Sequence, residues 1–344
     1  MPGVAGLAEQ KIRVASPVPD RWTGQDIAVP LFDGSEPAGF ELDCGATLDG
    51  AEFLVRITGP AGAPLVAVSG GISANRFVSD EASNKGWWSA LVAISGGIDL
   101  SKFRVLGFDF LPGDGTGIPA ITTGDQARAL AHALEFIGEP KLHAFVGSSY
   151  GGMVGLALAA EYPELLGRLC VISAAHRAHP MATAIRGIQR RILKFASARG
   201  CAEEGVALAR QLAMTTYRTE DEFALRFASI PQGDSAGDPY DVCEYLISRG
   251  EDFAREMPVE RLLLLSDSMD RHRVDPGRIA TPTLVIGVES DRLVPLGDMR
   301  ALVATLAGPA ELVELQSTYG HDAFLLETKI LAPLLHEFCE GETP

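Results

Sequence analysis

Short apolar runs recur along the chain, and segments of helical periodicity separate several of them. Most of these runs are four to eight residues long and rich in β-branched or aromatic residues, which is typical of buried parallel strands. The seven runs are EFLVRIT at 52–58, PLVAVS at 64–69, RVLGFDF at 104–110, LHAFV at 142–146, RLCVIS at 168–173, TLVIGV at 283–288 and ELVEL at 311–315. Strands that alternate with helices predict an α/β fold, with a mostly parallel sheet and helices on both faces.

The alternation stops between residues 177 and 278, where the pattern is almost entirely helical. Helical periodicity is found here at 183–196, 203–218, 241–257 and 260–270. An insertion of this kind between two strands is placed to cover the carboxyl edge of the sheet, where ligands bind in open α/β folds. We therefore predict a core domain of residues 36–176 and 279–344, and a helical lid domain of residues 177–278.

The first 35 residues are rich in Pro, Ala and Gly and carry little periodicity, so we predict a surface arm at 1–35. They show no apolar core behind a basic start, so no signal peptide is expected. No stretch approaches the roughly 20 continuous apolar residues of a membrane helix. The five cysteines are scattered and odd in number, which indicates a reducing, cytoplasmic setting.

A formal net charge of −16 argues against nucleic acid or an anionic membrane as a partner. Against this background, residues 177–199 hold six basic side chains where the chain average predicts about two. They are Arg177, Arg186, Arg190, Arg191, Lys194 and Arg199. The part of this basic cluster from 186 to 199 is either a site for phosphate groups or a solvated helix face.

The stretch GSSYG at 147–151 fits the G-x-S-x-G pattern, with a predicted strand before it and a helical pattern after it. Glycines on both sides let the chain turn sharply and expose the central hydroxyl. We therefore predict that Ser149 is a nucleophile and that Ser148 is structural. The N–H groups at the start of the following helix favour negative charge that develops beside this serine.

A serine nucleophile needs a base, and the base needs an acid that orients it. In this fold the chain order is Ser, then Asp or Glu, then His. His321 follows the last predicted strand and Asp291 follows the strand at 283–288, so we predict a triad of Ser149, His321 and Asp291. Asp270 and Asp275 compete for the acid position from within the lid. Three other histidines are interpreted as structural: His132, His143 and His336.

The oxyanion hole of this fold combines two backbone N–H groups. One belongs to the residue after the nucleophile, which is Tyr150 here. The other comes from the loop after the strand at 64–69, which reads GGISANRF. Ile72 is our candidate for the second donor, and the neighbouring Gly71 remains open.

Several motifs resemble the homoserine O-acyltransferases, a branch of the α/β-hydrolase fold, over residues 38 to the C-terminus. They are GWW at 86–88, GSSYGGM at 147–153, ARQLAMTTYR at 209–218, SDRLVP at 290–295 and YGHDAFL at 319–325. The resemblance implies transfer of an acyl group from acyl-CoA to L-homoserine through an acyl-serine, in methionine biosynthesis. It also implies that Arg210 binds the carboxylate of the amino acid and that Asp322 binds its ammonium group. It further implies a homodimer through the lid helices, with no cofactor and no metal.

The chain departs from the acetyl-transferring pattern and resembles the succinyl-transferring members. The glycine-rich segment after 104–110 is short, and AAHRAHP at 174–180 is unusually basic. A succinyl group ends in a carboxylate, which needs a cationic partner when buried. Arg177 and Arg76 are our candidates for that partner. Succinyl-CoA is the favoured donor, and acetyl-CoA is the alternative.

Three further alternatives stay open. The acceptor could be serine, because one methylene discriminates by only about 1–3 kcal/mol. A serine esterase or thioesterase would share the triad but would have no use for Arg210 and Asp322. A non-catalytic scaffold of the same fold would normally lack part of the triad.

Overall fold

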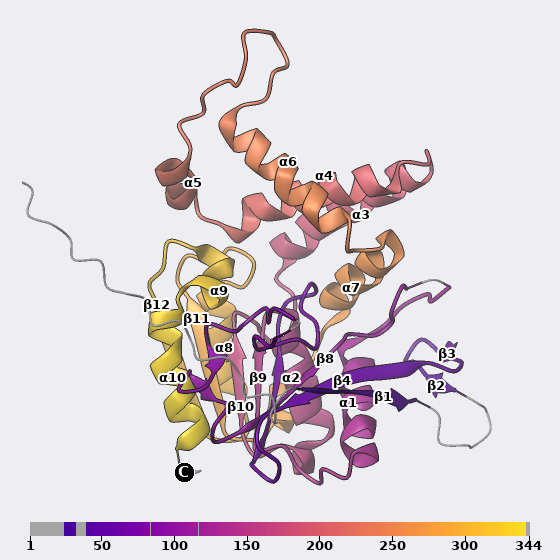
Figure 1. The fold of residues 1–344 in the computed structure, drawn as a ribbon, viewed down its shortest axis with the longest axis vertical. Helices are drawn as coiled ribbons and strands as arrows, with labels where there is room; N and C mark the ends of the chain where they lie inside the picture. The colour runs from indigo at the N-terminus through magenta and orange to yellow at the C-terminus, as the bar shows by residue number, and fades with distance from the viewer. Residues whose placement is uncertain (1–23, 32–38, 83, 116, 342–344) are drawn as a thin grey trace, which may run out of the picture.

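The central feature is an eight-stranded sheet in the order β1-β4-β8-β5-β9-β10-β11-β12 (Figure 1). This computed structural model describes residues 24–31, 39–82, 84–115 and 117–341. The strands from β8 to β12 run parallel, and β1 and β4 complete one edge in antiparallel pairing. All seven predicted runs contain a strand: β4 (Glu52–Thr58), β5 (Leu65–Ser69), β8 (Arg104–Phe108), β9 (Ala144–Ser148), β10 (Leu169–Ile172), β11 (Thr283–Val288) and β12 (Ala310–Leu315).

The predicted arm at 1–35 is wrong in its last part. Residues Gln25–Pro30 form β1, which pairs with β4 from Gln25 opposite Ile57 to Pro30 opposite Glu52. Most of its side chains are exposed, so the strand lacks the apolar alternation that would reveal it in the sequence. The strand is held by its pairing with β4, which lies more than twenty residues away in the sequence. The rest of the predicted arm, at 1–23 and 32–35, lies outside the described residues.

Two hydrophobic clusters cover the two faces of the sheet. Alternate residues of β5 divide between them, Leu65 and Ala67 into one and Val66 and Val68 into the other. The first cluster packs under α1 (Thr123–Phe136), α2 (Tyr150–Glu161) and α8 (Leu296–Thr305). The second packs under α10 (Thr328–Glu340) and the segment 87–103. That segment holds the small pair β6 (Val92–Ala93) and β7 (Ile98–Asp99), while β2 (Phe40–Glu41) pairs with β3 (Thr47–Leu48) beside the first cluster.

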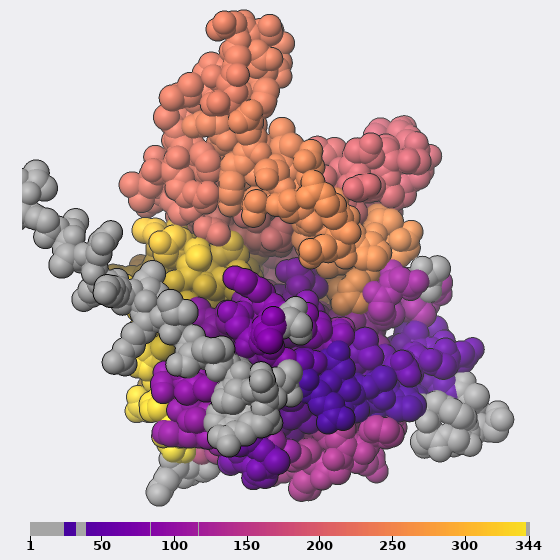
Figure 2. Space-filling view, in the orientation of Figure 1, coloured from indigo at the N-terminus to yellow at the C-terminus, as the bar shows by residue number. Residues whose placement is uncertain are grey.

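Five helices lie between β10 and β11, in the region predicted to be the lid. They are α3 (Pro180–Ser197), α4 (Ala202–Tyr217), α5 (Glu220–Arg226), α6 (Asp241–Ala254) and α7 (Val259–Arg271). They stand over the sheet on the side where the parallel strands end (Figure 1). In the space-filling view they form a separate upper mass above the core (Figure 2). This arrangement places lid side chains opposite the ends of the strands, where Ser149 follows β9.

Candidate active site

Ser149 sits on a sharp turn between β9 and α2. Its backbone φ is 52°, in the left-handed region that is uncommon for a residue with a side chain. A Cβ atom on Gly147 would lie 2.5 Å from the carbonyl oxygen of Gly151, and one on Gly151 would lie 2.5 Å from that of Ser69. The Gly151 N–H donates to the Gly70 carbonyl over 2.7 Å. The glycines predicted to permit this turn are thus required by close backbone packing.

Ser149, His321 and Asp291 form one hydrogen-bonded row. His321 Nε2 lies 2.8 Å from Ser149 Oγ, and His321 Nδ1 lies 2.7 Å from Asp291 Oδ2. The other oxygen of Asp291 accepts from the N–H groups of Leu293 and Val294. Because the carboxylate can only accept, Nδ1 carries the proton and Nε2 is free to accept from the serine hydroxyl. The geometry is that of a serine nucleophile with its base and orienting acid.

The surroundings of His321 shift its pKa. The ring is buried, and burial alone would lower that pKa. The charge and hydrogen bond of Asp291, with a further contribution from Asp322, outweigh burial and raise the pKa of His321 above its usual value of 6.5. The base is therefore strengthened by the acids beside it.

The competing acids and histidines have other partners. Asp270 on α7 accepts from Arg186 and Thr183, and Asp275 accepts from the N–H of Gly277. The ring nitrogens of the three histidines interpreted as structural contact Pro30 O (His132), Cys339 O (His143) and Glu340 (His336). None of these five residues lines the cavity described next, as far as the described chain shows.

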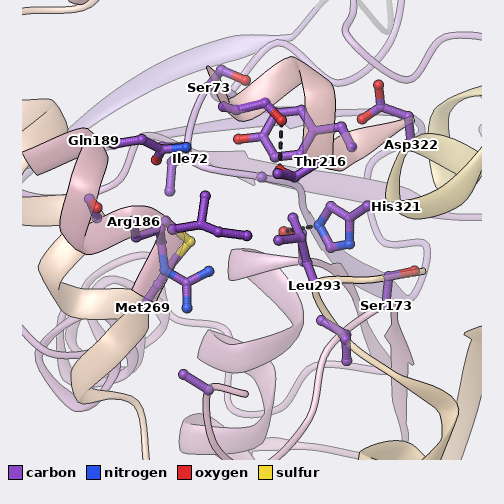
Figure 3. Close-up of a pocket in the computed structure, with 18 of the residues that line it drawn as sticks. Ile72, Ser73, Ser173, Arg186, Gln189, Thr216, Met269, Leu293, His321 and Asp322 are labelled. Carbon is purple, nitrogen blue, oxygen red and sulfur yellow. Dashed lines mark hydrogen bonds between the residues drawn. The ribbon is translucent and has the colours of Figure 1, made fainter. Parts of the chain in front are cut away.

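A cavity of about 260 Å³ separates the core from the lid. Ser149, His321 and Asp322 line it from the core, and α3 and α4 line it from the lid. In Figure 3, Arg186 and Gln189 lie on one side, while His321 and Asp322 lie on the opposite side. Both Ile72 and Gly71 line the cavity, so the structure leaves both open as the second oxyanion donor. The N–H of Tyr150 belongs to the first turn of α2, where N–H groups have no intrahelical partner.

Arg210 reaches this cavity from α4. Its guanidinium carbon lies 4.7 Å from the ring centroid of Phe253 and 5.2 Å from that of Tyr217. Its Nε is buried and has no hydrogen-bond partner within the described chain, and no ion pair to Arg210 is found there. An unpartnered buried donor on a cation is costly, so this arrangement suits an anionic ligand.

Asp322 follows the histidine directly and lines the same cavity. Its Oδ2 accepts from Nε of Arg218, at 2.6 Å. Sequence reasoning missed Arg218, although it is the last residue of the motif ARQLAMTTYR. No local pattern shows that this arginine and Asp322, 104 positions apart, are in contact.

The two arginines predicted to bind a donor carboxylate differ in whether they line the cavity. Arg76 does not line the cavity, and its guanidinium is held by Asp109 at 2.6 Å and Asp26 at 3.1 Å. These ion pairs, one of them to Asp26 in β1, engage the guanidinium away from the cavity and argue against this candidate. Arg177 lines the cavity and is exposed. Arg186 lines it as well, yet is buried.

The basic cluster at 186–199 does not form one surface. Arg186 and Arg190 turn inward to Asp270 on α7, with nitrogen–oxygen distances of 2.6 and 2.7 Å. Arg191 and Lys194 are exposed, and Arg199 stacks on Phe195. Two arginines on one buried carboxylate leave a surplus positive charge at the cavity wall.

Two features are absent from residues 24–31, 39–82, 84–115 and 117–341. No group of three or more His, Cys, Asp or Glu side chains is arranged to hold a metal ion. No helix in these ranges combines the length and the apolar character needed to cross a membrane.

Comparisons with known proteins agree with this geometry. The α/β-hydrolase fold family matches residues 81–328. A homoserine O-succinyltransferase of Xanthomonas campestris pv. campestris is 43% identical over 93% of this chain and 88% of its own length. A homoserine O-acetyltransferase of Thermus thermophilus is 33% identical over 74% of this chain and 72% of its own length.

Solved structures share the fold at low sequence identity. The homoserine O-acetyltransferase from Bacillus anthracis superimposes with a TM-score of 0.82 at 14% identity, over 93% of this chain and 98% of that one. Esterase E22 gives 0.80 at 17% identity, over 92% of this chain and 99% of that one. Because acyltransferases and esterases are equally similar, these likenesses show the fold alone.

The raised pKa of His321 predicts how acylation depends on pH. With p-nitrophenyl acetate as a probe, the acylation rate should fall as pH decreases through a midpoint above 6.5, because protonated His321 cannot accept from Ser149. Asp291→Asn removes the charge that raises this pKa, so the midpoint should move to lower pH. The maximal rate should also fall, by roughly 10²–10⁴-fold. Asp275→Asn is the matched control and should keep the wild-type profile; a wild-type midpoint below 6.5 would contradict the assignment.

Proposed function

The chain belongs to the homoserine O-acyltransferase family of the α/β-hydrolase fold, and on this premise we propose that it transfers succinyl from succinyl-CoA to L-homoserine. The observation that carries the proposal is the pair of opposite charges beside the nucleophile. Arg210 offers a buried, unpartnered donor, and Asp322 offers a carboxylate in the same cavity. An amino-acid zwitterion needs one fixed cation and one fixed anion. An esterase has no use for such a pair.

The reaction proceeds in two halves on Ser149. His321 Nε2 takes the serine proton as Oγ attacks the thioester carbonyl, a C–O bond forms, and the C–S bond breaks. His321 returns the proton to the departing thiolate, which leaves an acyl-serine. The homoserine hydroxyl then gives its proton to His321 and attacks the ester, and Ser149 regains the proton as it leaves. The N–H of Tyr150 and one from the loop at 71–72 stabilise the oxyanion of both tetrahedral intermediates.

The preference for succinyl rests on cations across the cavity from the acceptor site. Arg186 shares Asp270 with Arg190, so this buried group carries a surplus positive charge, and Arg177 adds another at the cavity wall. An acetyl group would leave this surplus positive charge uncompensated, whereas the terminal carboxylate of succinyl would compensate it. We place the reaction in the cytoplasm, in keeping with five free cysteines.

The function is tested by the consumption of acyl-CoA with the purified protein. Succinyl-CoA should be consumed at a rate that depends on homoserine, faster than acetyl-CoA and faster than with serine as acceptor. Loss of the ultraviolet absorbance of the thioester is the suitable readout, because exposed Cys44 and Cys243 would react with thiol reagents. Ser149→Ala should abolish the reaction. Equal consumption without any amino acid would identify a thioesterase, and a preference for acetyl-CoA would overturn only the donor.

Arginine variants test the choice of donor. Arg177→Ala and Arg186→Met should raise KM for succinyl-CoA about tenfold more than KM for acetyl-CoA, because a charged hydrogen bond to the terminal carboxylate is lost. Arg191→Ala on the exposed face of α3 is the matched control and should change neither value. Circular dichroism should show that Arg186→Met is folded. An unchanged ratio of the two KM values in both variants would contradict the succinyl site.

We further propose a homodimer through the lid helices. Met181, Ile188 and Phe195 recur every seven residues along α3 and are 60%, 51% and 61% exposed, and Leu208 on α4 is 52% exposed. Exposed apolar stripes of this kind mark association surfaces. Light scattering should give twice the mass of the chain, and Ile188→Asp should halve it. Phe136→Asp, an equally exposed site on α1 of the core, should leave the dimer intact; a monomeric wild type would contradict the proposal.

A further inference from the structure

We propose that Arg218 is a positioning residue for the second half-reaction, which holds Asp322 so that one of its oxygens is presented to the ammonium group of the acceptor. The inference rests on the proposed function, because it requires an acceptor with an ammonium group. It assigns a role to the last residue of ARQLAMTTYR, which the mechanism above does not use.

The contact that carries the proposal is an ion pair between lid and core. Arg218 caps α4 at its C-terminus, and its Nε lies 2.6 Å from Asp322 Oδ2. Both side chains are largely buried, with 14% and 12% of their surface exposed. In the described chain no hydrogen bond to Asp322 Oδ1 is found, while Asp322 lines the cavity. One oxygen is therefore occupied by the guanidinium, and the other remains for a ligand.

Arg218 is itself held in place from the far side. Its Nη1 donates to Glu222 Oε1 over 3.1 Å, and Arg226 donates to the same oxygen over 2.9 Å. Glu222 is 4% exposed, and Thr219 Oγ1 caps the first turn of α5 by accepting from the Glu222 N–H. A buried arginine fixed by two carboxylates has little rotamer freedom. It can therefore fix the orientation of the carboxylate it binds.

The lid backbone around Arg218 docks directly on the loop that carries His321 and Asp322. The Thr219 hydroxyl donates to the Thr318 carbonyl. Gly320 has a φ of 58°, and a Cβ there would lie 2.7 Å from the Tyr217 carbonyl oxygen. This close contact places Arg218 within reach of Asp322 and leaves no room for a side chain at 320.

The charges explain why such a residue is needed. Without Arg218, Asp322 would be a largely buried carboxylate with no cation in the free enzyme, which is costly and leaves its orientation undefined. The acceptor would then have to order that carboxylate when it binds. A preformed ion pair removes this cost, so its loss should weaken acceptor binding. Acylation of Ser149 by the donor does not use Asp322 as a ligand, so that half-reaction should be spared.

The experiment separates acylation of Ser149 from transfer of the acyl group to homoserine. Arg218→Gln should raise KM for homoserine roughly 10–100-fold, the loss expected for a charge-assisted contact. The pre-steady-state burst of succinyl-CoA consumption should stay within about twofold of the wild type. 4-Hydroxybutyrate is an acceptor that has no ammonium group. For this acceptor, the KM of Arg218→Gln should differ little from the KM of the wild type. In an Asp322→Asn background, Arg218→Gln should not raise KM for homoserine any further, because both substitutions remove the same interaction.

Controls address folding and alternative roles. Arg218→Lys should recover part of the affinity for homoserine, since it restores the charge without the guanidinium geometry. Arg226→Gln touches the same Glu222 but not Asp322, and should leave KM for homoserine unchanged. An unchanged KM in Arg218→Gln, or a burst slowed as much as turnover, would overturn the inference. Wild-type protein that consumes acyl-CoA without using homoserine would overturn the proposed acceptor itself, a distinct result.

Discussion

The turn that holds Ser149 at a positive φ is the constraint on which the site depends. It places the hydroxyl 2.8 Å from His321 Nε2, with the backbone of Ser149 at a φ of 52°. The conformation is maintained because Gly147 and Gly151 pack against backbone atoms with no space for a Cβ. Such strain persists only where the surrounding structure determines it fully, and here the sheet on one side and α2 on the other do so.

The core holds the candidate triad of Ser149, His321 and Asp291, whereas the lid holds three arginines that line the cavity. Arg177, Arg186 and Arg210 all belong to the lid and line the cavity opposite the strand ends. Two ion pairs hold the lid in position. Arg186 pairs with Asp270 within the lid, and Arg218 pairs with Asp322 of the core.

Much of the fold was predictable because it follows from local patterns. The parallel strands β5, β8, β9, β10 and β11 are largely buried, so they appear in the sequence as continuous apolar runs. The pairing of Ser149, His321 and Asp291 was predictable because each follows a strand, and the carboxyl ends of parallel strands meet at one edge. The edge strand β1 was missed because an exposed strand has no such run, and the ion pair of Arg76 with Asp26 in β1 was missed with it.

The amino-acid sequence by itself determined the α/β architecture, the helical insertion and the candidates for nucleophile, base and acid. These depend on the periodicity of apolar residues and on the order of motifs along the chain. Only the tertiary structure decided which charges are free and which are paired. Within the described residues it left Nε of Arg210 without a hydrogen-bond partner, turned Arg186 toward the cavity, and joined Arg218 to Asp322. The reason is physical: an ion pair forms between side chains that folding brings within about 4 Å, and separation along the chain says nothing about that distance.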